Sequence, residues 1–110
     1  MAETINVSLD IQSTIKLIEK KVVWGSISGE CTDKLLIEVP GKGSLAMLVF
    51  EKHYMRMGNR LSLTVTLDDF SGNTRVHWVS GGGGKLLGFD WGASESFESA
   101  IEKALIKWRV

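Results

Sequence analysis

Two side chains in this sequence are suited to acid–base chemistry, the carboxylate of Glu51 and the imidazole of His77. Alternating apolar and polar residues predict that both lie on antiparallel strands, on either side of a strand that carries Thr66. The three side chains then form one row across a polar sheet face. Because the middle strand separates them, Glu51 and His77 are about 9–10 Å apart and need a ligand or water between them to act together.

This row depends on the turns that join the strands. The middle strand, residues 61–67, alternates without a break, which is typical of a half-buried strand. A two-residue hairpin loop at Gly58-Asn59 brings Glu51 opposite Thr66 and sets apolar side chains of the two strands opposite one another.

A second two-residue loop, at Ser71-Gly72, sets the register with the following strand and places Asp68 opposite Arg75. The polar face opposite the core is then either a solvated surface or a site for a small polar ligand or a second subunit. Its candidate residues are Glu51, His53, Thr66, Arg75 and His77.

Two amphipathic helices are predicted, one near each end of the chain. Apolar residues recur every three or four positions over residues 11–23, and Asp10 is suited to cap that helix. The same period runs from Phe97 to Trp108, with acidic residues at its start and basic residues at its end. Each helix has one apolar stripe, so both are expected to cover the same face of the sheet.

The remaining segments alternate as strands do. Residues 26–39 alternate in two pieces, separated by a bend or bulge at residues 32–34, and residues 40–43 form a turn. Further strands are predicted over residues 5–9, 45–55 and 61–67, before Ser80, and, as a short last strand, over residues 86–89. The expected fold is a single α+β domain, residues 1–110, with the order strand, helix, four or five antiparallel strands, helix. Both helices are expected to lie on one face of a curved antiparallel sheet.

The run from Gly81 to Gly84 lacks the spacing of a phosphate-binding loop. Val79 stands where that motif requires its first glycine, and Leu86 replaces the hydroxyl residue. The four glycines are therefore interpreted as a loop, or as the point where the sheet bends or ends.

Composition excludes several classes of function. The 13 basic and 13 acidic residues cancel without a basic run, so no nucleic-acid or membrane partner is indicated. No apolar run approaches the roughly 20 residues that span a bilayer, no signal peptide is recognised, and the single cysteine, Cys31, suits a reducing compartment. We therefore expect a soluble cytoplasmic protein. No metal site is expected, because no two of the histidines and the cysteine have ligand spacing. No cofactor and no catalytic residues are assigned from the sequence.

Large aromatic residues suggest a second kind of site. Trp78, Trp91, Phe97 and Trp108 are expected at or near the contact between the last helix and the sheet. They either fill the core there or line an apolar pocket.

The segments G-N-R-L-S-L-T-V-T-L and V-S-G-G-G-G, together with the C-terminal amphipathic helix, resemble a small bacterial family of about this length that is classed as a domain of unknown function. The resemblance covers nearly the whole chain and implies no activity, cofactor or catalytic residue. The order of elements is also similar to TATA-box-binding-protein-like and helix-grip folds, many of which hold apolar ligands between sheet and helix.

The sequence therefore favours a non-enzymatic binding or protein-interaction domain, which self-associates through the polar sheet face or holds a small apolar ligand near its last helix. The alternative is a small hydrolase- or isomerase-like enzyme that uses Glu51 and His77. A third possibility is a purely structural partner of another protein.

Overall fold

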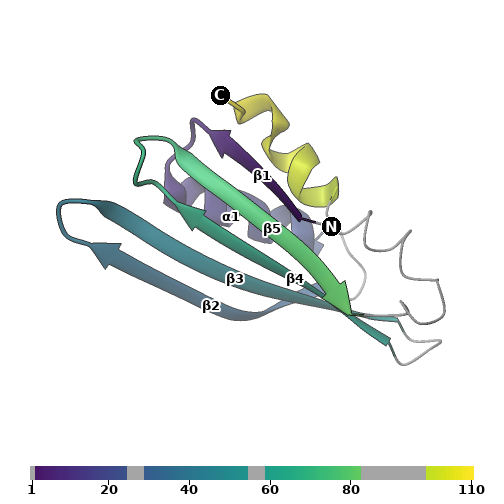
Figure 1. Ribbon diagram of the computed structural model, residues 1–110. Helices are drawn as coiled ribbons and strands as arrows, with labels where there is room; N and C mark the ends of the chain where they lie inside the picture. The colour runs from purple at the N-terminus through teal and green to yellow at the C-terminus, as the bar shows by residue number, and fades with distance from the viewer. Residues whose placement is uncertain (1, 25–28, 55–58, 83–98) are drawn as a thin grey trace.

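One antiparallel sheet of five strands, in the order β1-β5-β4-β3-β2, forms the body of the protein (Figure 1). The computed structural model describes residues 2–24, 29–54, 59–82 and 99–110. The strands are β1 (Ala2–Val7), β2 (Gly29–Val39), β3 (Gly43–Tyr54), β4 (Asn59–Asp68) and β5 (Thr74–Gly82). Helix α1 (Ile11–Trp24) follows β1, and the chain ends in a helix over residues 99–105 that tightens into the 3₁₀ turn η2 (Ile106–Trp108). The predicted α+β class is confirmed.

Helix α1 forms where its sequence pattern predicts it. The apolar stripe Ile11, Ile15, Ile18 and Val22 is buried, which is the reason this face turns toward the sheet. At its start the backbone N–H of Ser13 donates a hydrogen bond of 3.1 Å to Oδ2 of Asp10, so the predicted N-cap is confirmed.

Both helices pack on the same face of the sheet, which we call the helix face; the opposite one is the outer face. The buried cluster contains the α1 stripe and the alternating residues of the strands. It also contains Ile101, Ala104 and Leu105 of the segment from residue 99 to residue 108, here called the C-terminal helix. Trp78 and Phe50 are the largest side chains that this core encloses. A single core therefore joins the sheet to both helices.

A β-bulge divides β2 as the sequence predicts, and it changes which face the second half of β2 uses. The register with β3 shifts between Cys31, which lies opposite the buried Phe50, and Asp33, which lies opposite Val49. A bulge adds one residue to one strand, so every later side chain changes face. Leu35 and Ile37 therefore lie on the outer face. Their even spacing from Cys31 alone would place them on the same face as Cys31, which is the helix face.

The predicted register between β3 and β4 is wrong by four residues. Asn59 belongs to β4 and pairs with Tyr54, so it is not a loop residue, and Glu51 lies opposite Ser62 instead of Thr66. A shift by an even number of residues keeps each side chain on its predicted face while it changes every partner. Alternation alone cannot distinguish these registers, because both set apolar side chains opposite one another.

The predicted register between β4 and β5 is confirmed. Thr66 lies opposite His77, and Asp68 lies opposite Arg75. The connection is longer than the predicted two-residue loop, since β4 ends at Asp68 and β5 begins at Thr74. The first two residues of the glycine run, Gly81 and Gly82, pair with β4 and so extend the strand; the predicted strand at residues 86–89 lies outside the described residues.

The end of the chain pairs with residues 6–8, at the end of β1 on its free edge. The N–H of Ser8 donates to the carbonyl of Trp108 at 2.9 Å, and the N–H of Val110 donates to the carbonyl of Asn6 at 3.0 Å. A bridge between Val7 and Arg109 completes this contact. The backbone bonds fix the last turn of the C-terminal helix beside β1.

Candidate functional site

The outer face of the sheet does not bring Glu51 and His77 together. Met47, and not Glu51, lies opposite Thr66, which in turn lies opposite His77. Glu51 is displaced by four residues along β3, so its Cα lies about 16 Å from that of His77 at a rise of about 3.3 Å per residue and a strand spacing of about 4.8 Å. The predicted row is wrong in this respect, and the enzymatic alternative loses the geometry on which it rested.

The other candidate residues of the outer face make contacts within the sheet. Arg75 Nε donates to Asp68 Oδ2 at 2.9 Å, and a hydrogen bond of 2.7 Å joins Thr4 Oγ1 to His77 Nδ1. The backbone of His53 pairs with that of Arg60. Within the described residues, no three histidine, cysteine or acidic side chains are grouped as a metal site requires.

The outer face is also less polar than predicted. Leu35 and Ile37 of β2 lie opposite Met47 and Leu45 of β3, so four apolar side chains gather at one end of it. Sequence reasoning missed this patch because the bulge moves Leu35 and Ile37 off the face that Cys31 occupies.

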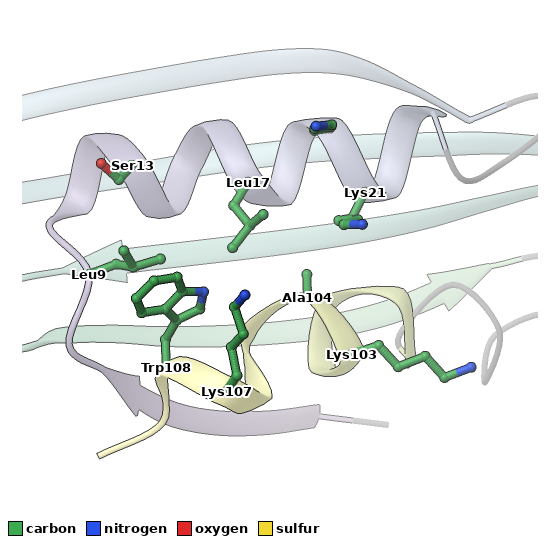
Figure 2. A pocket seen from close by; sticks show the side chains of 9 residues that line it. Leu9, Ser13, Leu17, Lys21, Lys103, Ala104, Lys107 and Trp108 are labelled. Atoms are coloured by element: carbon green, nitrogen blue, oxygen red, sulfur yellow. The ribbon is translucent and has the colours of Figure 1, made fainter.

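A groove lies between α1 and the C-terminal helix (Figure 2). Its volume of about 460 Å³ falls within the range of small-ligand sites. The residues that line it come from both helices and from the segment before α1: Leu9, Ser13, Leu17, Lys20, Lys21, Lys103, Ala104, Lys107 and Trp108.

The floor of the groove is apolar. In Figure 2 the side chain of Leu17 points from α1 toward the indole of Trp108, and Leu9 lies beside that ring. Leu17 stands next to the buried stripe of α1 and is only half-buried, which leaves part of it on the groove. Ala104 contributes a small side chain, so the two helices leave space between them.

Four lysines line the groove, two from each helix. Lys20 and Lys21 lie near the end of α1, while Lys103 and Lys107 stand one turn apart on the C-terminal helix. None of the described residues that line the groove is acidic, although the whole chain has as many acidic as basic residues. The groove is therefore a local concentration of positive charge on a neutral protein.

One of these lysines also contacts the floor. Lys107 Nζ lies 5.3 Å from the centroid of the Trp108 ring, within the range of a cation–π interaction. Lysine side chains place aliphatic stems along apolar surface and keep their ammonium groups in water. Such a site can hold an apolar chain or ring on its floor and an anionic group at its rim.

The predicted pocket residues do not all lie in one place. Trp108 lines the groove, whereas Trp78 is 1% exposed and belongs to the core. The indole Nε1 of Trp78 is buried without a hydrogen-bond partner among the described residues. Trp91 and Phe97 lie outside the described residues, so the predicted pocket between the last helix and the sheet stays a prediction.

Sequence reasoning missed the groove because its two walls are about 85 residues apart in the chain. One signal was present: Lys103 and Lys107 are spaced four residues apart, so they lie on one side of a helix. The sequence alone does not show that this side faces Lys20 and Lys21.

The chain belongs to a family of unknown function (DUF6054), whose model matches residues 1–109. Neither the comparison with curated proteins nor that with solved structures found a match. The family assignment confirms the resemblance to a domain of unknown function, and the function must be inferred from the chain itself. No helix among the described residues is long and apolar enough to cross a membrane.

Proposed function

We propose that this protein is a non-enzymatic binding domain that holds an anionic amphiphile, such as a fatty carboxylate or an alkyl phosphate, between α1 and the C-terminal helix. The observation that carries the proposal is the combination of an apolar floor with four lysines and no carboxylate among the described lining residues. An apolar ligand alone leaves the lysines unused, and a small inorganic anion alone leaves the floor unused.

The two parts of the ligand contribute in different ways. Contact with Leu17 and Trp108 removes apolar surface from water, which stabilises the complex by about 25 cal/mol per Å². The lysines are solvated, so each ion pair contributes only about 0.2–1 kcal/mol, and salt weakens it. The floor therefore provides most of the affinity, and the lysines select the charge of the ligand.

Calorimetric titration with dodecanoate tests the proposal. Substitution of two groove lysines, Lys103→Gln with Lys107→Gln, is expected to weaken binding by about 2–30-fold, from about 0.4–2 kcal/mol for two pairs. The matched control is Lys16→Gln with Lys42→Gln, which changes the net charge equally at two positions that do not line the groove. Equal affinities of the two double variants would refute the proposal.

Related probes separate the roles of floor and rim. Dodecyl phosphate is expected to bind like dodecanoate, whereas the uncharged 1-dodecanoylglycerol and inorganic phosphate each lack one half of the interaction and are expected to bind more weakly. Binding of dodecanoate is also expected to weaken as salt rises, since screening acts on the lysine pairs. If 1-dodecanoylglycerol binds as tightly as dodecanoate, the lysines have no role in selection.

A further inference from the structure

The two edges of the sheet differ. The C-terminal residues pair with residues 6–8 at the end of β1, whereas β2 pairs only with β3 among the described residues. Residues 32–38 of β2 are all exposed, and three of them in succession are large and apolar: Leu35 is 49% exposed, Leu36 38% and Ile37 42%. An exposed edge strand with unpaired backbone groups is a template for another strand.

The residues around Leu36 have a pattern that is complementary to itself. The segment Lys34-Leu35-Leu36-Ile37-Glu38 carries a positive charge at one end and a negative charge at the other. Two copies that pair antiparallel about Leu36 place Lys34 opposite Glu38 twice, and Leu35 opposite Ile37 twice. A two-fold interface requires this kind of reciprocity.

We propose that β2 pairs antiparallel with β2 of a second copy of the chain, with Leu36 on the two-fold axis, so that one sheet runs through both copies. The charged pairs lie on the helix face, because Lys34 and Glu38 are opposite Leu48 and Ser44 of β3. The Leu35 and Ile37 pairs lie on the outer face. Opposite charges and apolar pairs directly across two strands both stabilise a sheet.

The charges also select the register. A slip that moves the axis to Leu35 places Lys34 opposite Leu36, and a slip to Ile37 places Glu38 opposite Leu36, so both lose the ion pairs. Charged side chains on an edge strand ordinarily oppose pairing with other strands. In the register centred on Leu36, each of these charged side chains instead lies opposite a side chain of opposite charge. Lys34 Nζ already lies 3.2 Å from Glu19 Oε1, so in the dimer it is shared between two carboxylates.

Charge exchange tests this interface in the full-length protein. Sedimentation equilibrium is expected to show a dimer that Glu38→Lys weakens at least tenfold, because two ion pairs become two repulsive contacts. Combining Lys34→Glu with Glu38→Lys restores complementarity and is expected to restore the dimer, whereas Lys42→Glu in the β2–β3 turn leaves it unchanged. A wild-type monomer at 200 µM, or a double variant no better than Glu38→Lys, would overturn the proposal.

A cross-link locates the axis. Opposite Cα atoms of antiparallel strands are about 4.5–5.5 Å apart, which suits a disulfide. With the single native cysteine replaced (Cys31→Ser), Leu36→Cys is expected to form a disulfide-linked dimer under mild oxidation. Leu45→Cys, on β3 and similarly exposed, is expected to stay reduced. Equal cross-linking of the two variants would show that β2 does not lie at the interface.

Discussion

Replacement of Gly43 by alanine should destabilise this protein more than replacement of the nearby Gly41, although both have positive φ. Gly43 begins β3 with φ of 138°, and an added Cβ meets Oδ1 of Asp69 and lies 3.1 Å from Phe70. Gly41 has φ of 76°, and an added Cβ there meets nothing within 4 Å. The comparison separates backbone strain from a steric effect.

The same carboxylate holds the neighbouring backbone. Asp69 Oδ1 accepts a hydrogen bond of 2.6 Å from the N–H of Ser44, and the N–H of Asp69 donates to the carbonyl of Ser44 at 3.2 Å. This pair of bonds joins the β2–β3 hairpin to the loop between β4 and β5. A methyl group on Gly43 must displace the carboxylate and therefore weakens the first of the two bonds.

The expected loss of unfolding free energy follows from these terms. Positive φ in a residue with a side chain costs about 1–3 kcal/mol, and loss of a hydrogen bond to a charged group costs about 1.5–3 kcal/mol. We expect the unfolding free energy to fall by about 3–4 kcal/mol for Gly43→Ala and by about 1–2 kcal/mol for Gly41→Ala, where only the backbone strain applies.

Urea unfolding followed by tryptophan fluorescence measures both losses. The double variant Gly43→Ala with Asp69→Ala lacks the displaced carboxylate, so its loss should be smaller than the sum of the two single losses. Equal losses for Gly43→Ala and Gly41→Ala, or strict additivity in the double variant, would refute the reasoning.

Two further predictions concern ionisation. Hydrogen bonds from the side chain and backbone of Ser13 lower the pKa of Asp10 from its ordinary value of 3.8. The charged carboxylate therefore stabilises the fold fully above pH 3.8, and this stabilisation is lost as the pH falls through the lowered pKa. Asp10→Asn keeps a capping oxygen but cannot titrate, and its melting temperature should fall less steeply in acid than that of the wild type. Burial, and then the charge of Glu19, raise the pKa of Cys31. Its alkylation by iodoacetamide at pH 7.5 should be several-fold slower in the native protein than in urea, and equal rates would contradict the packing described for this thiol.

Local patterns predicted much of this fold because their causes are local. The spacing of Ile11, Ile15, Ile18 and Val22 is sufficient to define the buried face of α1, and Asp10 identifies its start. The register of β4 with β5 was also predictable, because apolar side chains and opposite charges both favour it.

Long-range features were less accessible. Alternation has a period of two residues, so it could not separate the observed partner of Glu51, which is Ser62, from a partner four residues away. A bend or bulge was predicted from the break in alternation near Thr32. That Leu35 lies on the outer face follows only from the pairing of β2 with β3 on both sides of the bulge. The groove arises from the packing of two helices that are distant in sequence, and its lysines are ordinary surface residues in each helix taken alone.

The most direct test of the proposed function is the position of bound dodecanoate, observed by ¹H–¹⁵N NMR of the wild-type protein. We expect the indole N–H signal of Trp108 to shift on titration, together with the amides of Leu17 and Ala104, while the indole signal of the buried Trp78 stays in place. Shifts confined to the outer face of the sheet, or no shifts at millimolar dodecanoate, would contradict a ligand site between the two helices.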